Sequence, residues 1–332
     1  MNNLKKIGIS ALAGSLAAFS ANAVEMSVAG SAKVTYISNA PSEVTGNPYG
    51  MNTSLAFTGS GEVNGYATTL VIVNNDANTG LSSAALSVDL ADMGTIHFDQ
   101  GVGKAGLSTI DDVMPTAYEE SWDGMDAATT TSSNGLVGLG NSGVFGYVNT
   151  IAGTKLSASY GKGSQTANTD DTASGTGGGT SWDFALTNNE LYEGVNVGAG
   201  YGKIANDNQD SLLGSSDTDE HATAFVTYSM GPVTVGYQQT DRQDNTQGGV
   251  DEAAESMGIA INLMEGLSAS YNDREIEFKN ASAANVTEDA TGVAIAYTMG
   301  SAAIKLQHNE TDNNDGGTTN DERTEIALSL AF

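Results

Sequence analysis

The sequence predicts an all-β fold in which sixteen antiparallel strands close into a transmembrane barrel. Three observations support this prediction: apolar residues recur at every second position from Glu25 onward, the candidate strands are even in number, and long and short connections alternate between them. A barrel that spans a membrane needs all three, because each strand has one apolar face and each rim carries its own kind of connection.

The first candidate strand shows the period of two. Val28, Val34 and Tyr36 share one parity, while Ser31 and Lys33 lie on the other. The same rhythm recurs along the whole chain. The approximate strand cores are residues 25–37, 51–60, 65–74, 83–91, 94–100, 143–150, 154–163, 181–188, 194–203, 220–230, 232–242, 254–264, 266–278, 288–299, 301–310 and 322–332.

The connections distinguish the two rims of the barrel, one with tight turns and the other with long loops. Tight turns such as Glu62-Val63-Asn64-Gly65 follow the even strands, whereas long polar segments, the longest of them residues 101–134, follow odd strands. Strands of about 9 to 11 residues suit a tilted membrane crossing. A sixteen-stranded ring is too wide for side chains to fill, so we expect water in the lumen.

The first 23 residues predict a cleaved signal peptide, which leaves residues 24–332 as one barrel domain. Lys5 and Lys6 precede an apolar run from Ile7 to Phe19, and Ala21-Asn22-Ala23 has the small-residue pattern of a cleavage site. The alternative is a membrane anchor, but the apolar run is shorter than the roughly 20 residues that a spanning helix needs. The sequence therefore predicts export.

Charge and cysteine content exclude several classes of function. The formal net charge is -28, and removing the two leader lysines leaves -30. This charge argues against a nucleic-acid partner and favours small cations, although a solvated acidic coat would explain it equally well. The chain has no cysteine, which rules out disulfides and thiolate metal sites.

The leader, the strand rhythm, the long third connection and the terminal Ile326-Ala327-Leu328-Ser329-Leu330-Ala331-Phe332 resemble the trimeric general porins of Gram-negative bacteria. The resemblance implies a homotrimer in the outer membrane, in contact with lipid and lipopolysaccharide, that passes ions and small hydrophilic solutes and is not an enzyme. It also implies that Phe332 is the signal recognised by the barrel assembly machinery.

In similar porins the third connection folds into the lumen and narrows it. In this chain that segment carries several carboxylates, among which Asp111, Asp112, Glu119 and Glu120 are the candidates for the acidic side of the constriction. Carboxylates that face bases across a narrow waist create a transverse field that orients dipolar solutes. The alternative is an acidic loop exposed to solvent.

The opposite, basic wall is assigned from strand parity. A base facing lipid at the bilayer centre costs about 2 to 4 kcal/mol, so bases in strand centres should point inward. Lys33, Lys305 and Arg323 have this parity in the first, fifteenth and sixteenth strands, which become neighbours when the barrel closes, and Arg274 also points inward. Family porins carry bases on their second to fourth strands, where this chain has none. The acidic excess predicts weak cation selectivity.

A few sequence patterns point to functions other than a channel, but each is weak. Gly101-Val102-Gly103-Lys104-Ala105-Gly106 matches a dinucleotide motif but stands alone. We expect no cofactor, except that the polar stretches 168–171, 206–210 and 312–315 could bind Ca²⁺. The main rival is accordingly a secreted, acidic, calcium-binding β-rich surface or adhesion protein, and a barrel with an enzymatic site at its rim is a second rival.

An aromatic belt is predicted where strands meet the loop-side rim. Seven tyrosines on the apolar parity are its candidates, namely Tyr36, Tyr160, Tyr201, Tyr228, Tyr237, Tyr271 and Tyr297.

Overall fold

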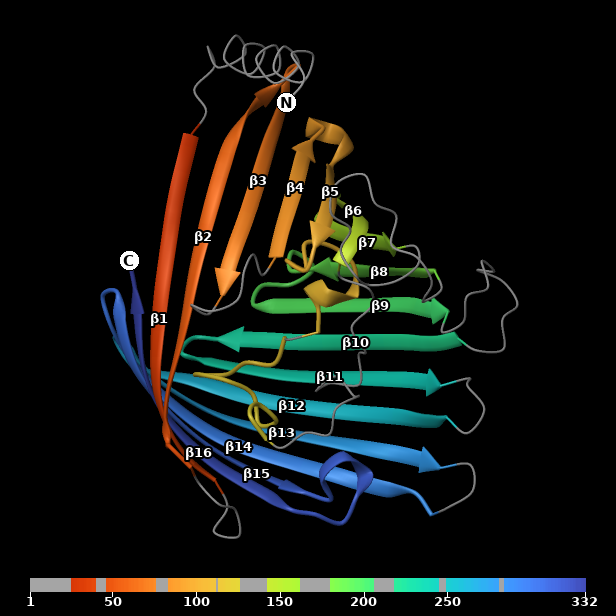
Figure 1. Cartoon of the computed structure of the whole chain (residues 1–332). Helices are drawn as coiled ribbons and strands as arrows, with labels where there is room; N and C mark the ends of the chain where they lie inside the picture. Colours follow the sequence, from red (N-terminus) through yellow and green to blue (C-terminus); the bar gives the residue numbers. More distant parts are fainter. Residues whose placement is uncertain are drawn as a thin grey trace, which may run out of the picture.

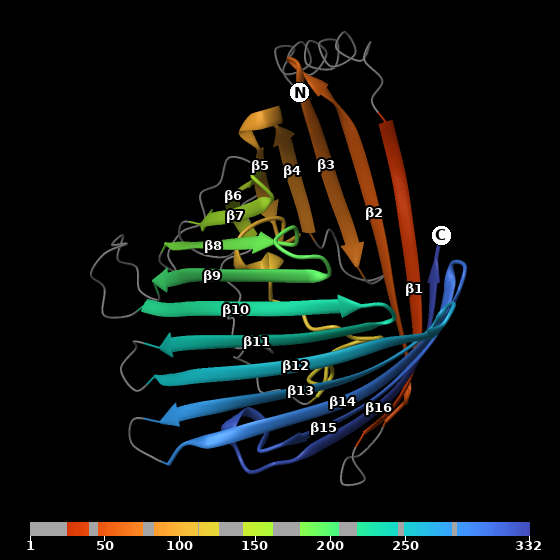
Figure 2. The same ribbon diagram turned by 180° about the vertical axis from the view of Figure 1, so that it is seen from behind.

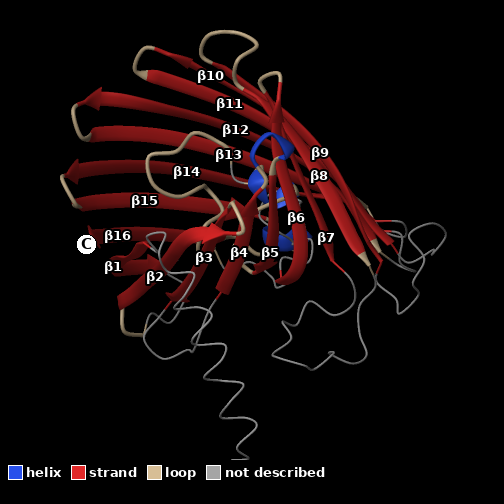
Figure 3. Ribbon diagram, turned by 90° about the horizontal axis from the view of Figure 1, so that it is seen from above, coloured by secondary structure: helices blue, strands red, loops and turns tan. Residues whose placement is uncertain are grey.

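The computed structural model describes residues 25–39, 46–75, 83–111, 113–125, 142–161, 180–205, 218–244, 249–280 and 284–332. These residues form sixteen strands that follow one another around a closed barrel (Figures 1 and 3). The strands are β1 (Glu25–Asn39), β2 (Tyr49–Val63), β3 (Tyr66–Asn75), β4 (Ser83–Asp89), β5 (Thr95–Gln100), β6 (Ser142–Ile151), β7 (Thr154–Gly161), β8 (Ser181–Asn188), β9 (Val195–Ala205), β10 (Thr218–Met230), β11 (Val233–Asp244), β12 (Val250–Met264), β13 (Leu267–Asn280), β14 (Val286–Met299), β15 (Ala302–Asp312) and β16 (Asp321–Ala331).

Helical structure in the described residues is confined to three single turns of 3₁₀ helix: η1 (Ala91–Met93), η2 (Leu107–Thr109) and η3 (Asn314–Gly316). Among these residues, no helix has the length and apolar character required to cross a bilayer. The predicted signal peptide, residues 1–23, lies outside the described residues.

The barrel closes where β1 meets β16, so the two ends of the domain lie side by side (Figure 2). The register runs antiparallel from Ser31 opposite Ala331 to Asn39 opposite Arg323. Beyond β16, the main chains of Phe332 and Gly30 exchange two hydrogen bonds of 2.8 and 2.9 Å. The last residue therefore extends the seam that joins the first strand to the last.

Two-residue turns connect strands at one rim because their sequences permit a left-handed backbone. Asn64 and Gly65 join β2 to β3 with φ values of 53° and 87°, and Ala152 and Gly153 join β6 to β7 with φ values of 49° and 77°. Positive φ at both central residues is typical of the type I′ turn, whose twist matches that of a hairpin. These turns fix the register of the strands that follow.

The two faces of each strand meet different surroundings, as the period of two predicts. On β14, the outward Val293 and Ile295 are 47% and 48% exposed, whereas the inward Ala290 and Ala294 are 0% and 3% exposed. Large apolar side chains cover the outer surface of strands around the barrel. The predicted sixteen-stranded barrel is thus confirmed, and the predicted core of β8, residues 181–188, coincides with the observed strand.

The prediction that the tyrosines share the loop-side rim is wrong. Tyr36 and Tyr160 lie near the loop ends of β1 and β7, but Tyr228 and Tyr297 lie two residues before the turn-side ends of β10 and β14. Their registers agree, since Tyr228 pairs with the first residue of β9 and Tyr297 with the first residue of β13. Successive strands run in opposite directions, so equal apolar parity does not imply an equal height.

A row of carboxylates crosses the outer surface near the loop-side ends of four neighbouring strands. Glu255 on β12 is directly opposite Glu275 on β13, which is opposite Asp289 on β14, which in turn is opposite Asp312 on β15. All four side chains are exposed. We name these residues the outer acidic row.

Candidate functional site

The described part of the third long connection, residues 101–111 and 113–125, lies against inward-facing side chains of the barrel (yellow in Figure 1). It leaves β5 and contacts inward residues of successive strands until it reaches β16 and β1. We call these residues the inner segment. Three kinds of contact hold it: hydrogen bonds to its amides, an apolar cluster, and hydrogen bonds to its carbonyls.

Carboxylates and hydroxyls of the wall accept hydrogen bonds from the first backbone amides of the inner segment. Asp99, at the end of β5, accepts hydrogen bonds from the amides of Val102 and Lys104 at 2.7 and 2.6 Å. Asp183 on β8 accepts one from the amide of Leu107 at 3.0 Å. Both carboxylates are buried, which places them beneath the segment rather than in open lumen.

An apolar cluster fixes the next turn of the segment. Leu107 and Ile110 pack against Ala185, Ile204 and Phe225 from β8, β9 and β10. Each of the two loop side chains is 1% exposed. Burying a side chain of this size contributes about 1.5 to 3 kcal/mol, so the cluster is a strong attachment point.

Side-chain amides of the wall bind the carbonyls of the inner segment. Gln238 donates to the Ile110 carbonyl at 3.0 Å and Asn272 to the Pro115 carbonyl at 3.2 Å. Two further amides, Gln307 and Asn309 on β15, donate to the carbonyl of Glu120 at 2.6 and 3.0 Å, and Asn309 also donates to that of Asp123 at 3.1 Å. The four amide-bearing side chains are 5% exposed or less.

Glycines on the wall allow this close approach. A Cβ at Gly236 on β11 would lie 2.6 Å from Cδ of Pro115, and one at Gly258 on β12 would lie 3.0 Å from the same atom. Neither distance is compatible with an unshifted neighbour. The absence of a side chain at these two positions therefore makes room for the segment.

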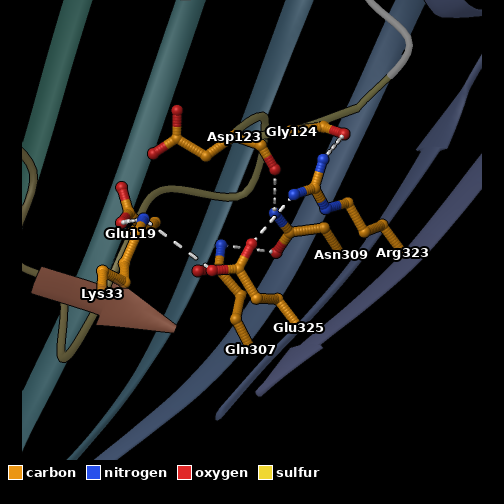
Figure 4. Close-up of a pocket in the computed structure, with 8 residues that line it drawn as sticks. All are labelled: Lys33, Glu119, Asp123, Gly124, Gln307, Asn309, Arg323 and Glu325. Atoms are coloured by element: carbon orange, nitrogen blue, oxygen red, sulfur yellow. Dashed lines mark hydrogen bonds and ion pairs between the residues drawn. The ribbon is translucent and has the colours of Figure 1, made fainter. Parts of the chain in front are cut away.

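The far end of the inner segment meets β15, β16 and β1 at a polar cavity of about 200 Å³ (Figure 4). The residues lining it are Lys33, Glu119, Asp123, Gly124, Gln307, Asn309, Arg323 and Glu325. The segment supplies two of its carboxylates and the wall supplies both cations.

Bases and carboxylates of this cavity are in direct contact. The Lys33 ammonium lies 3.2 Å from Glu119 and 3.8 Å from Glu325, while the Arg323 guanidinium lies 2.9 Å from Glu325 and donates to the carbonyl of Gly124. Tyr118 donates to Glu325 at 2.6 Å. The sequence placed acids and bases on opposite sides of a waist, whereas Glu119 and Lys33 form an ion pair where the segment meets the wall.

The other two predicted bases also contact the inner segment. The Lys305 ammonium lies 4.6 Å from the centre of the Tyr118 ring, over which Lys33 also lies at 5.5 Å. The Arg274 guanidinium stacks 4.7 Å from the Trp122 ring and forms an ion pair with Glu288. The four bases that strand parity predicted to point inward therefore all contact the inner segment.

Two neighbouring carboxyls in the inner segment have displaced pKa values. Burial, followed by the hydrogen bond and charge of Glu119, raises the pKa of Asp123 to about 6. Burial alone would also raise the pKa of Glu119, but its hydrogen bond to Asp123 and the charge of Lys33 outweigh this and lower it. Of the two carboxyls, Asp123 is therefore the one that takes up a proton first as the pH falls.

The remaining predicted acids are placed differently. Glu120 is 7% exposed and lies at the bend whose carbonyl is held by β15, whereas Asp111 is exposed. Asp112 lies outside the described residues. The structure thus brings Glu119 into contact with Lys33 and holds the carbonyl of Glu120 against β15, whereas Asp111 lies near the middle of the segment.

Sequence reasoning missed the residues that hold the segment. The sequence offers no pattern that singles out Asp99, Asp183, Gln238, Asn272, Gln307 or Asn309 for this role. Their only signal is a polar side chain at an inward position, which is shared by ordinary pore-lining residues.

Metal binding finds no support in the described part of the chain, where no three His, Asp or Glu residues gather in a way that could hold an ion. The candidate calcium stretches 168–171 and 206–210 lie outside the described residues. For these two stretches and for 312–315 the calcium hypothesis stays a prediction.

Comparison with known proteins gives a likeness of fold. No family model matches this sequence, and no curated protein matches it. Among solved structures, OmpT of Vibrio cholerae in its in-vitro folded form has a TM-score of 0.67 at 13% identity, covering 92% of this chain and 97% of that one. OmpF of Salmonella typhi has a TM-score of 0.65 at 13% identity, covering 93% and 98%.

A mutant of the Rh. blastica porin matches with a TM-score of 0.60 at 12% identity, covering 93% of this chain and all of that one. A trimer form of Vibrio cholerae OmpT matches with a TM-score of 0.63. These likenesses extend over nearly the whole described barrel. The chain accordingly shares the barrel fold of these outer-membrane proteins and porins.

Proposed function

We propose that this protein is an outer-membrane porin: a water-filled channel through which ions and small hydrophilic solutes diffuse passively, with a weak preference for cations. The observation that supports this most is the reversal of faces around a closed ring. Large apolar side chains point outward along the strands, and polar or charged ones point inward. An exposed apolar belt of this extent requires lipid, and a polar lumen of this width requires water.

The inner segment is proposed to form the waist of the channel. It lies inside the barrel wall at the level where Lys33 and Arg323 reach Glu119 and Glu325. Asp111, Asp112, Glu119 and Glu120 would be the acidic residues of the waist, and Lys33, Lys305, Arg274 and Arg323 its basic residues, with Lys33 and Glu119 paired where the segment meets the wall. The channel needs no covalent chemistry and no cofactor.

The assembly and location follow from the same proposal. Residues 1–23 would direct export, Phe332 would be read by the barrel assembly machinery, and the mature chain would form a homotrimer among lipid and lipopolysaccharide. The likeness to a trimer form of OmpT supports the oligomer.

The deciding experiment is single-channel recording of residues 24–332 in a planar bilayer, with the reversal potential measured across a salt gradient. We expect stepwise conductance and a reversal potential on the cation side. A folded protein that inserts without conducting would refute the channel. A monomer fully folded in detergent-free buffer would instead favour the secreted, calcium-binding alternative.

A further inference from the structure

Two exposed lysines lie near the start of the inner segment: Lys104 in the segment itself, and Lys155, the first inward-facing residue of β7. Among the residues that the structure describes, no carboxylate forms an ion pair with either ammonium group. The other inward lysines and arginines of the described strands have partners: Lys305 lies over the ring of Tyr118, and ion pairs hold Lys33, Arg242, Arg274 and Arg323. Two unpaired positive charges are therefore unusual in a chain whose formal net charge is -28.

The contacts of the inner segment bring the two lysines to the same part of the wall. Asp99 of β5 accepts a hydrogen bond from the amide of Lys104, and the Ser157 hydroxyl of β7 accepts one from the amide of Gly106 at 2.8 Å. Lys155 is the next inward residue of β7 on the turn side of Ser157, about 7 Å along the strand. Both lysine side chains therefore begin close to the place where the segment passes from β5 to β7.

The imidazole of His97 on β5 lies within reach of both ammonium charges. A Cβ on Gly146 of β6 would lie 2.6 Å from the Cβ of Ala105 and 3.4 Å from the Cβ of His97, so the inner segment passes close beside this histidine. The hydroxyl of Ser87 on β4 lies 2.8 Å from Nδ1 of the imidazole. When that hydroxyl donates to Nδ1, the neutral ring carries its hydrogen on Nε2 and can donate a further hydrogen bond from there.

Two inward carboxylates lie on the neighbouring strands β4 and β5, and each accepts hydrogen bonds from the backbone. Asp99 is 2% exposed, its charge also acts on the imidazole, and its oxygens accept the amides of Val102 and Lys104. Asp89, nearer the turn-side rim, accepts the amide of Ala91 at 2.9 Å. Hydrogen bonds of this charge-assisted kind satisfy part of the negative charge of each carboxylate. Neither carboxylate is in ion-pair contact with the lysines, whose side chains are exposed to solvent.

We propose that Lys104, His97 and Lys155 form a binding site for a phosphate group on the turn side of the inner segment, occupied by inorganic phosphate or by a small phosphate monoester. The inference rests on the proposed channel function, which brings such solutes into the lumen, and it names an anionic solute class that the lumen retains.

The chemistry of the three side chains favours phosphate over a carboxylate. A phosphate monoester carries about 1.5 to 2 negative charges at pH 7, which two ammonium groups can balance. Its oxygens point in different directions, so donors on the inner segment, β5 and β7 can each bind one, whereas a carboxylate offers a single charge and two oxygens in one plane. The lumen as a whole can still prefer cations, because salt screens charges that lie more than about 8 to 10 Å apart.

The site is tested by phosphorus NMR on the barrel folded in detergent at pH 8, with inorganic phosphate and glycerol 3-phosphate as probes. Line broadening of each probe should yield a dissociation constant for the wild-type protein, and acetate, followed by its proton signal, should bind about tenfold more weakly. Lys104→Gln and Lys155→Gln should each weaken phosphate binding about tenfold, and His97→Leu about threefold. Lys279→Gln is the matched control, because it removes the same charge from an exposed position on the outer face of β13.

Wild-type phosphate binding in the variant that combines Lys104→Gln with Lys155→Gln would overturn the site. An equal loss in Lys279→Gln would also overturn it, since binding would then depend on net charge alone. Binding of glycerol 3-phosphate without binding of inorganic phosphate would support the site and identify the monoester as its ligand. Single-channel recording separates these results from the proposed function: a barrel that conducts without binding phosphate contradicts the site alone, and a barrel that binds phosphate without conducting contradicts the channel alone.

Discussion

The ring of Phe332 lies against the main chain of Gly30 on the outer face of the barrel, where their backbones share two hydrogen bonds. A Cβ added to Gly30 would collide with that ring. The seam between the first and last strands thus depends on a position without a side chain. The aromatic terminus can lie flat there only because β1 offers bare backbone.

Gly30→Val should destabilise this seam. Overpacking a tight contact typically costs about 1 to 3 kcal/mol, so the thermal midpoint in detergent should fall. Gly59→Val is the matched control, because Gly59 lies on the outer face of β2 and a Cβ there meets no atom within 4 Å. Equal midpoints for the two variants would show that the contact with Phe332 carries no stability.

Neutralising one member of the outer acidic row should stabilise the barrel. Glu275 faces like charges on both neighbouring strands, and such pairs destabilise by about 0.2 to 1 kcal/mol each. Glu275→Gln should therefore raise the thermal midpoint at low salt, with the gain shrinking as salt screens the row. Glu277→Gln is the control, since its direct partners are Ala253 and Thr287. An equal gain from both variants would argue against cross-strand repulsion.

Docking of the inner segment should weaken as the pH rises through about 6. The docked pKa of Asp123 is raised from 3.8 to about 6, so its contribution is complete below about pH 4 and is lost as the carboxyl ionises. Glu119 acts in the opposite sense, because its lowered pKa adds stability that is lost only in acid. Hydrogen exchange of residues 113–125, corrected for its intrinsic pH dependence, should accelerate between pH 5 and 8.

Asp123→Asn should remove this change, because an amide mimics the protonated carboxyl at every pH. Asp92→Asn, in the distant turn η1, is the control and should keep the wild-type profile. Protection of residues 113–125 that stays constant across the range in the wild type would disprove the titration.

Neutralising Asp111 and Asp112 together should move the reversal potential toward anions. Two fixed negative charges near the waist raise the local concentration of cations, and their removal lowers it. Glu310→Gln combined with Glu322→Gln changes the net charge equally on the outer face and should leave the reversal potential unchanged. A wild-type value in the Asp111 and Asp112 double variant would exclude these residues from the waist.

Strand positions were predictable because the alternation of surroundings leaves a mark at every second residue. The bounds of β8 and the adjacency of β1, β15 and β16 followed from that pattern and from closure alone. The heights of Tyr228 and Tyr297 did not, because parity carries no information about the direction in which a strand crosses the wall.

The docking of the inner segment was not predictable in detail. Leu107 meets Asp183 across 76 positions of sequence, and Asn309 meets Glu120 across 189. Such contacts join a side chain to a main-chain group, so neither partner shows a periodic pattern or a recognisable motif. The sequence shows that these wall residues are polar, but only the structure shows that they hold the inner segment.

The amides of Gln238, Asn272, Gln307 and Asn309 bind carbonyl oxygens, which every amino acid possesses. These hydrogen bonds therefore do not depend on which side chains the inner segment carries at the positions that accept them. Side chains elsewhere in the inner segment can therefore be substituted, and the width of the channel changed, while the same four wall amides keep the segment in place.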